Sequence, residues 1–355
     1  MSSPFTRLAS LAAAGRPFGV ATVVRTQGST PQTVGARLFL PADGDSRPSG
    51  TLGGGCVEAD AILALRDALA GQPPTIREYR LTEELAWNTG LVCGGTMWIL
   101  AEAGLAAATI DGHSLVSEIE AAVTGRAPMA IVTRVLRRDG AFALAGRMAV
   151  LSGDRVIGSL GDAAVTARAA AAAGAQIARG PAARIVLAEG DEILVEPIVP
   201  RPRLVIAGGG HVAQAIARQA RLVDFEVTIL EDRPEYADPD RFAGATVVQG
   251  DVAAALASMD LSGQTFVVVA TRGHKMDADC VLAAAKTTVR YIGLLGSRRK
   301  RVLVAEMLRE AGVGEARVAA IHAPVGLDLG GRTPAEIALS VLAEITQFRY
   351  GKAGS

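Results

Sequence analysis

The chain has few cysteines, few aromatic residues and no formal net charge. Only three cysteines occur among 355 residues, and they are widely spaced. No disulfide framework is therefore expected, and the thiols should stay reduced. Aromatic side chains make up 4% of the sequence against 50% for hydrophobic residues, so the cores must consist of Ala, Val, Leu and Ile. The formal charge is zero and no basic run alternates with aromatics, which argues against a nucleic-acid partner.

Long uncharged apolar runs are absent as well. No stretch of about 18 apolar residues lacks a charge, and even the alanine-rich AAVTARAAAAAGAQIA carries Arg168. The opening residues, MSSPFTRLASLAAAGRPFG, show neither the charged start nor the long apolar core of a signal peptide. We therefore expect a cytoplasmic protein without membrane insertion.

The proline-rich stretch EPIVPRPR (196–203) predicts a linker, because proline blocks helix and favours extended chain. It separates an expected domain at 1–199 from another at 200–355. The first domain repeats itself: 8–24 aligns with 115–135, and 35–54 aligns with 146–162. The sequence CGGTMWILAE (93–102) aligns loosely with EGDEILVEP (189–197). We therefore predict two related α+β units, at about 1–105 and 113–199.

The second domain alternates short β-branched runs with helical stretches. This pattern predicts a doubly wound α/β fold with a parallel sheet, that is, a Rossmann-like domain. The predicted strands are RLVIAG (203–208), EVTILE (226–231), ATVVQG (245–250), TFVVVAT (265–271) and RYIGLLG (290–296). The last helix should begin with Thr333 as its N-cap, Pro334 at its first position and Glu336 completing a capping box.

The turn GGGHVA follows the first of these strands and reads G-x-G-x-x-A. Gly208 would make the tight turn, Gly210 would let a phosphate approach, and Ala213 would let the helix pack on the sheet. Glu231 ends the next strand, where a ribose-binding acid belongs. His211 would face a bound phosphate. The pattern indicates a nucleotide or similar ligand, although a turn that is glycine-rich only for packing is the alternative.

Two further glycine-rich loops carry thiols. In GTLGGGCVEAD (50–60), the glycines Gly53, Gly54 and Gly55 lead to Cys56 at the predicted start of a helix, with Glu58 in its first turn. In GLVCGGT (90–96), Cys93 precedes Gly94 and Gly95. The second repeat lacks both cysteines, which favours chemistry or binding over a purely structural role. Small structural cysteines remain the alternative, and Cys280 is expected to be an inert helix residue.

Other loops supply polar candidates. In GSTPQTVGARL (28–38), Ser29 and Thr30 offer donors, and Arg37 offers a fork that suits phosphate or carboxylate. Loops after the carboxyl ends of parallel strands bind ligands in doubly wound folds. The loops ATRGHKMD, GSRRKR and HAPVGLD therefore contribute the candidates His274, Asp277, Ser297, Arg298, His322 and Asp328.

Taken in order, these motifs resemble the xanthine dehydrogenase accessory (XdhC/CoxI) family over nearly the whole chain. The longest matching segments are YIGLLGSRRKR and IHAPVGLDLGGRTPAEIALSVLAEI. The sequence departs from the family at Arg272 and His274, where a histidine pair is common, and at Val92 and Cys93, where a double cysteine is common.

The resemblance implies a chaperone for the molybdenum cofactor in its molybdopterin form, and an accessory factor more than a turnover enzyme. It would support sulfuration by a cysteine desulfurase and insertion into a hydroxylase of the xanthine dehydrogenase, aldehyde oxidoreductase or carbon monoxide dehydrogenase type. Cys56 and Cys93 would lie near molybdenum as ligands or sulfur relays, with Glu58 as a polar neighbour. We expect the cofactor in a cleft between the two domains of the chain. We also expect a homodimer, since two-fold dimers are the commonest assemblies.

Two alternatives remain open from the sequence. An NAD(P)-dependent oxidoreductase would use the glycine-rich turn and Glu231, although only His211, His274 or His322 could act as its acid. A phosphate at that turn could equally come from the molybdenum cofactor or from another nucleotide. The second alternative is a non-catalytic assembly factor that bridges proteins without touching the cofactor.

Overall fold

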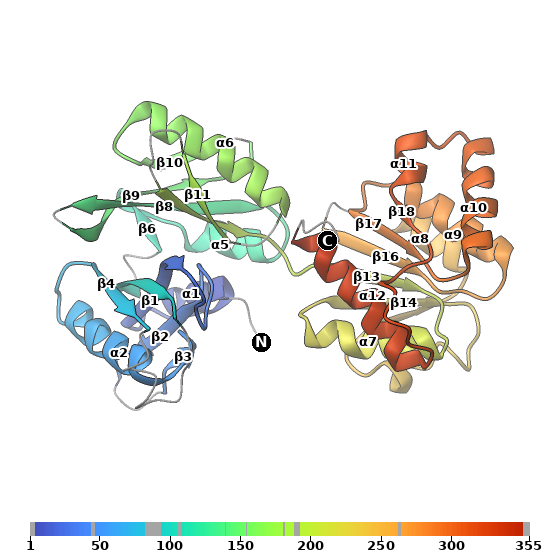
Figure 1. The fold of residues 1–355 in the computed structure, drawn as a ribbon, viewed down its shortest axis with the longest axis horizontal. Coiled ribbons are helices and arrows are strands. Elements are labelled where there is room, and N and C mark those ends of the chain that lie inside the picture. The colour runs from blue at the N-terminus through green and yellow to red at the C-terminus, as the bar shows by residue number, and fades with distance from the viewer. Residues whose placement is uncertain are drawn as a thin grey trace. The chain divides into compact units, whose positions relative to one another are not determined.

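A computed structural model describes residues 4–43, 47–81, 94–104, 108–138, 140–153, 155–179, 182–187, 192–261 and 264–350. The chain divides into two compact units, Met1–Pro200 and Arg201–Ser355, both drawn in Figure 1. Within the described part of the chain, no helix has the length and apolar character needed to cross a membrane.

The first unit contains two copies of one α+β motif, as the sequence repeats predict. The first copy runs through α1 (Pro4–Ala13), β1 (Phe18–Gln27), β2 (Arg37–Pro41), β3 (Ser49–Gly50), α2 (Gly55–Leu69), β4 (Thr75–Arg80) and β5 (Thr96–Ala103). After the hairpin β6 (Thr109–Ile110) and β7 (His113–Ser114), the second copy runs through α5 (Val116–Val123), β8 (Met129–Arg138), β9 (Ala141–Val150), β10 (Val156–Ser159), α6 (Ala163–Arg179), β11 (Ala183–Val186) and β12 (Glu192–Ile198). The antiparallel sheets have matching orders, β3-β2-β1-β5-β4 and β10-β9-β8-β12-β11.

The two sheets of this unit pack against each other between two helices. Alternate side chains of β1, β2 and β5 pack under α2, while those of β8, β9 and β12 pack under α6. The opposite faces of the two sheets share apolar clusters that contain residues of both copies. In Figure 1, α6 and α2 accordingly lie on opposite sides of the paired sheets. Strand β1 is buried on both faces because a helix covers one and a sheet covers the other.

Two reciprocal ion pairs cross between the copies inside this sandwich, in addition to the pair of Arg25 and Glu192. Arg147 donates to both carboxylate oxygens of Glu102, at 2.9 and 2.7 Å. Arg37 donates to Glu196 Oε2 at 3.0 Å, and both of those side chains are almost fully buried. The pairs are reciprocal, since each takes its base from one copy and its acid from the other.

The strand registers show that these four residues are equivalent in pairs. Arg37 and Arg147 each lie opposite a threonine of the central strand, and Glu102 and Glu196 occupy matching positions in β5 and β12. The two pairs are nevertheless unequal. Glu196 Oε1 has no hydrogen-bond partner among the described residues. Burial raises the pKa of Glu196 against the opposing attraction of Arg37 and Arg147.

The second unit is a doubly wound α/β domain, as predicted. Its elements are β13 (Arg203–Ala207), α7 (His211–Leu222), β14 (Glu226–Glu231), the 3-10 helix η2 (Pro239–Phe242), β15 (Thr246–Gln249), α8 (Val252–Ser258), β16 (Thr265–Val269), α9 (His274–Ala285), β17 (Tyr291–Leu294), α10 (Arg298–Glu310), α11 (Glu315–Ala319), β18 (Ile321–His322) and α12 (Pro334–Arg349). The parallel order β15-β14-β13-β16-β17-β18 is that of a Rossmann fold.

Helices cover both faces of this sheet. One face packs against α7 and α12, and the other packs against α8, α9, α10 and α11. The predicted cap of α12 is confirmed: Thr333 Oγ1 accepts from the Glu336 amide at 3.3 Å, while the Glu336 carboxylate accepts from the Thr333 amide at 2.9 Å. These bonds satisfy amides that the helix itself leaves unpaired.

The crossed ion pairs yield a stability prediction. Arg147→Met should destabilise the first unit by about 3–5 kcal/mol, because it strands Glu102 without a partner in a buried site. Replacing both residues by Met and Leu should cost much less. Both tryptophans of the chain fall within residues 1–200, so urea unfolding followed by tryptophan fluorescence reports on this unit.

Arg77→Ala is the control for that series. Arg77 pairs with Asp60 on the surface, with 37% and 45% of the two side chains exposed. Its loss should change the free energy of unfolding by less than about 1 kcal/mol. A single Arg147 variant that is as stable as this control would remove the structural role given to the crossed pairs.

Candidate functional site

Three glycine-rich loops of the first copy meet at one end of its sheet. A methyl group at Gly95 would stand 2.4 Å from the carbonyl oxygen of Ser29, so only glycine fits there. A methyl group at Gly53 would stand 2.6 Å from the ring of Pro31. The loops around Ser29, Gly53 and Gly95 therefore lie against each other, although they are far apart in the sequence.

The turn before α2 depends on glycine and on Glu58. Gly53, Gly54 and Gly55 have φ values of 106°, 84° and 64°, in the region that favours glycine. Glu58 Oε1 accepts from Thr51 Oγ1 at 2.7 Å and from the amides of Leu52 and Gly54 at 2.9 and 3.0 Å. Burial acts to raise the pKa of Glu58, but these bonds outweigh it and lower the pKa.

The second copy folds the same turn with a hydroxyl in place of the carboxylate. Thr166 Oγ1 accepts from the Leu160 amide at 3.1 Å, as Glu58 accepts from Leu52. The Gly161 amide donates to Ser159 Oγ at 3.1 Å, in the position of the bond between Gly53 and Thr51. The fold of the turn is therefore common to both copies. The carboxylate that accepts from the Leu52 amide and the neighbouring thiol are specific to the first copy, whereas the second copy carries Asp162 at its turn, where it accepts from the Val165 amide at 2.8 Å.

Cys56 is the second residue of α2 and is exposed to solvent. Thr30, in the adjacent loop, donates its hydroxyl to the Gln32 carbonyl at 2.8 Å. Cys93 lies outside the described residues, so the structure does not test a partnership of the two thiols. Across the residues the structure describes, no group of three His, Cys, Asp or Glu side chains could hold a metal ion.

Arg37 differs from its expected role. Its guanidinium is buried between the copies, paired with Glu196, and it lies 4.3 Å from the centre of the Phe5 ring. The fork predicted to bind an anion is thus directed into the protein. The sequence did not indicate this partner, which lies 159 positions away.

A cavity of about 450 Å³ opens beside Gly28 and Gly94, in a place that sequence reasoning missed. Three arginines, Arg25, Arg80 and Arg137, line it. They come from β1, β4 and β8, three strands that lie apart in the sequence, and none belongs to a glycine-rich motif. The sequence signal for these arginines is the alternation of charged and apolar residues at the strand ends.

In the second unit, the predicted turn lies where neighbouring strands diverge. Gly208 has a φ of 110°, and a methyl group there would stand 2.4 Å from the Ala270 carbonyl oxygen. Gly210 is the N-cap of α7, His211 is its exposed first residue, and Ala213 is buried against the sheet. The backbone roles predicted for these glycines match this geometry.

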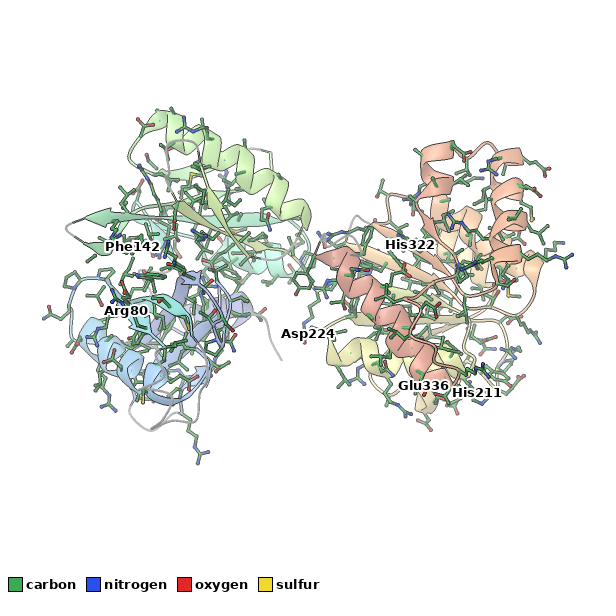
Figure 2. The ribbon with its side chains drawn as sticks, in the orientation of Figure 1. Arg80, Phe142, His211, Asp224, His322 and Glu336 are labelled. Atoms are coloured by element: carbon green, nitrogen blue, oxygen red, sulfur yellow. The ribbon has the colours of Figure 1, made fainter. Side chains whose placement is uncertain are left out.

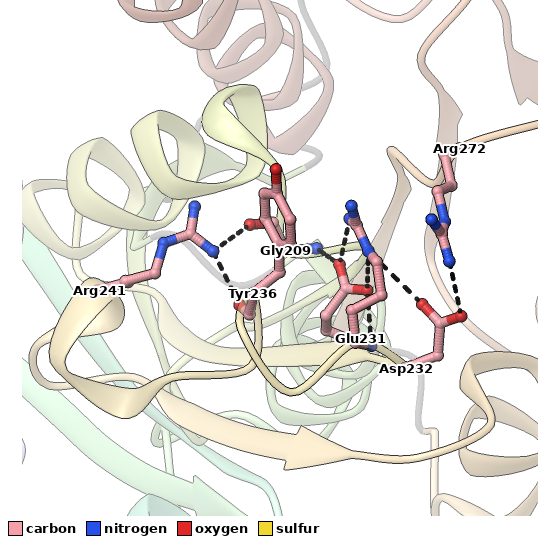
Figure 3. A network of polar contacts seen from close by, with 7 residues as sticks. Gly209, Glu231, Asp232, Tyr236, Arg241 and Arg272 are labelled. Carbon is pink, nitrogen blue, oxygen red and sulfur yellow. Dashed lines mark hydrogen bonds and ion pairs between the residues drawn. The ribbon is translucent and has the colours of Figure 1, made fainter.

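Glu231 is engaged within the protein, as Figure 3 shows. Its carboxylate accepts from the Gly209 amide at 2.6 Å. It also accepts from Arg233 Nε at 2.9 Å and from Arg233 Nη2 at 3.0 Å. Burial on its own would raise the pKa of Glu231, but the bonds from Arg233 and Gly209 lower it to about 2. A ribose hydroxyl would have to displace Arg233, and the Gly209 amide is not available to a phosphate.

The carbonyl side of Gly209 is held as well. Arg241 donates to the carbonyl oxygens of Gly209 and Tyr236, both at 3.0 Å, and Arg233 stacks on the Tyr236 ring at 3.7 Å (Figure 3). At the rim, Arg272 lies 3.5 Å from Asp232. The turn is thus fixed by side chains from β14 and the segment that follows it.

Two of the remaining candidates, Asp277 and Ser297, contact the same residue, Lys300. Asp277 is buried, accepts from Thr271 Oγ1 at 2.7 Å and pairs with Lys300. Ser297 caps α10 by accepting from the Lys300 amide at 3.3 Å. Arg298 and Asp328 are exposed, and His274 begins α9.

His322 lies away from the turn. It pairs with Glu344 of α12, whose carboxylate also accepts from Tyr291 at 2.8 Å. Burial acts to raise the pKa of Glu344, but the bonds from His322 and Tyr291 lower it. Figure 2 shows His322 and His211 well separated. His211 and His322 therefore do not converge.

The engaged carboxylate predicts how the second unit responds to acid. The folded-state pKa of Glu231 is below its ordinary value of 4.5, so its contribution is complete above pH 4.5 and is lost as the pH falls towards 2. It amounts to at most about 3 kcal/mol at neutral pH. Glu231→Gln should unfold at lower temperature at pH 7 and show a flatter pH dependence in circular dichroism. Glu226→Gln, an exposed change on the same strand, should behave as wild type, and identical profiles for both variants would contradict the prediction.

Comparison with known proteins extends over both units. Residues 11–80 match the model of the XdhC and CoxI family, and residues 204–345 match that of the XdhC Rossmann domain. The chain is 28% identical over 342 residues to a probable xanthine dehydrogenase subunit of Bacillus subtilis (strain 168), covering 93% of this chain and 92% of that protein. It is 25% identical over 336 residues to the molybdenum cofactor insertion chaperone PaoD of Escherichia coli (strain K12), covering 94% and 84%.

Two further similarities concern length and fold. The chain is 28% identical over 352 residues to the uncharacterized protein YqeB of Escherichia coli (strain K12), and the match covers 99% of this chain but 47% of YqeB. The crystal structure of a xanthine dehydrogenase from Bacillus halodurans superimposes with a TM-score of 0.75 at 22% identity, covering 99% of this chain and 97% of that one. That likeness concerns the fold. Because models of one family match segments of both units, the chain belongs to the XdhC and CoxI family.

Proposed function

We propose that this protein is an accessory factor that binds the molybdenum cofactor, supports its sulfuration and delivers it to a molybdenum hydroxylase. The observation that carries the proposal is the meeting of three glycine-rich loops beside an exposed thiol in the first copy. The relative PaoD, named a molybdenum cofactor insertion chaperone, supports it. The Bacillus subtilis relative, named as part of a probable xanthine dehydrogenase, supports the same class of target.

The chemistry of the loops suits such a cargo. The cofactor combines a phosphate, a polar pterin and a metal held by sulfur, so it needs backbone amides at close range and a soft ligand. Glycines without side chains let those amides approach, and Cys56 supplies sulfur at the start of α2. Glu58 already holds the turn through one oxygen. We assign to it the position of the loop and a negative charge near the thiol.

The partners follow from this role. A cysteine desulfurase would supply the sulfur that replaces an oxo ligand. The acceptor would be a hydroxylase of the xanthine dehydrogenase, aldehyde oxidoreductase or carbon monoxide dehydrogenase type. We further propose that the protein acts as a homodimer in the cytoplasm, since two-fold dimers are the commonest assemblies of soluble proteins.

The oxidoreductase alternative has weaker support. The acid expected to bind a ribose is occupied by Arg233 and Gly209. His211 and His322 lie well apart, so these two side chains do not combine in one catalytic site. We therefore expect NAD(P) titration of the purified protein to show no tight binding, in contrast to a dehydrogenase with the same sheet order.

Removing the exposed thiol should weaken cofactor binding. Protein purified from cofactor-making cells should contain nearly stoichiometric pterin and molybdenum, and Cys56→Ala should contain several-fold less. Cys280→Ala is the matched control, because that thiol is fully buried and its burial raises its pKa to about 12. Equal pterin and molybdenum in all three proteins would make Cys56 a structural residue.

A neutral side chain of the same shape separates the charge of Glu58 from its structural role. Glu58→Gln should keep the turn folded, because its amide oxygen can accept the same bonds from Thr51, Leu52 and Gly54. If the carboxylate matters for the cargo, this variant should keep wild-type thermal stability while losing pterin content or sulfuration. Unchanged cofactor content and transfer would limit Glu58 to fold stability.

A further inference from the structure

The cavity beside Gly28 and Gly94 is a second feature of the loop cluster. It lies against the sheet face that looks away from α2, because Trp98 belongs to the core between the two copies while its neighbours Met97 and Ile99 pack under α2. Cys56 does not line it. The described lining residues are Arg25, Gln27, Gly28, Glu78, Arg80, Gly94, Thr96, Trp98, Arg137 and Phe142.

Arg25 is held in a fixed position in this cavity. Its Nε donates to Glu192 Oε2 at 2.8 Å, from the first copy to the second. Its guanidinium lies 4.2 Å from the centre of the Trp98 ring and 5.0 Å from that of Phe142. Stacking and the ion pair together reduce the rotamer entropy that binding a ligand would otherwise cost.

Of the other two arginines, Arg80 pairs with a carboxylate and Arg137 donates to the Gly140 carbonyl at 3.4 Å. Arg80 Nε lies 2.5 Å from Glu78 Oε1, and Trp98 Nε1 donates to Glu78 Oε2 at 3.1 Å. Arg80 is the main cause of the lowered pKa of Glu78, and the charge of Arg137 contributes to it. Glu78 is therefore ionised and has a donor on each oxygen. Glu192 pairs with Arg184 as well as with Arg25, so four guanidinium groups accompany the two carboxylates Glu78 and Glu192, which leaves an excess of positive charge.

We propose that this cavity binds the phosphate end of a phosphorylated heterocyclic ligand. Arginine forks recognise phosphate oxygens in pairs, Thr96 adds a hydroxyl, and Gly28 and Gly94 leave room for close backbone approach. A volume of about 450 Å³ lies in the range that accommodates a small organic ligand. That the ligand is a pterin rests on the function proposed above. Its phosphate is either the monoester of the simple form or the pyrophosphate of a dinucleotide form.

Titration of the full-length apo protein with inorganic pyrophosphate tests the anion site directly. Arg137→Ala is the sharper variant, because it leaves the pair of Arg80 and Glu78 intact, and Arg80→Ala is the second. Each should weaken pyrophosphate binding by about tenfold to a hundredfold, the loss expected for a hydrogen bond to a charged group. Arg77→Ala, on the same strand as Arg80 but paired with Asp60 outside the cavity, should bind as wild type.

Pterin content of the same proteins, purified from cofactor-making cells, identifies the source of the phosphate. Pterin in the wild type that falls in both cavity variants supports the site. Pterin that persists in both variants, with no pyrophosphate binding, overturns the site and leaves the proposed function standing. Pyrophosphate binding that depends on Arg137 without any pterin supports the site and overturns the proposed cargo. Nucleotide released in a one-to-one ratio with pterin when the loaded protein is denatured and its cofactor hydrolysed would indicate the dinucleotide form, and pterin without released nucleotide would indicate the monoester.

Discussion

The first unit depends on two arginine–glutamate pairs that cross between its copies. Apolar packing resists the sliding of two sheets, and a buried charge adds a further constraint, because moving it away from its partner leaves it uncompensated. Arg37 directly follows the first glycine-rich loop, and Glu102 lies in the strand that begins after Gly95. Fixing these two residues against the second copy therefore fixes both loops. The convergence of the loops follows from pairs that lie outside them.

The second unit shows how a nucleotide-type fold can differ from a nucleotide-binding site. Its strand order and the left-handed Gly208 are those expected of the fold. Yet the acid at the end of β14 neutralises Arg233 and holds the Gly209 amide, so the turn supports its own structure. The fold of this unit therefore does not by itself establish nucleotide binding, since the same backbone can form with or without a bound ligand.

The sequence was sufficient for features that are local or periodic. Strand runs, the α12 cap at Thr333 and the duplication all follow from patterns within short segments. Partners far apart in the chain left no such pattern. Arg37 read as a loop arginine because nothing nearby identifies Glu196 as its partner, and Arg25, Arg80 and Arg137 looked like ordinary strand-end charges. Arg233 lies only two residues after Glu231, but the dinucleotide-binding pattern specifies only the acid and so does not indicate this partner.

The crossed pairs also have the form of a symmetric interface. If two identical chains of one copy faced each other, an arginine from each would meet a glutamate from the other, and one surface would make both contacts. The joined copies retain that arrangement with unequal strength, since one pair is bidentate and the other is single. Because both halves belong to one chain, their sequences can differ, which the sequences of two identical subunits cannot. One half holds its turn with the Thr166 hydroxyl and the Asp162 carboxylate, while the other has Glu58 and an exposed thiol there.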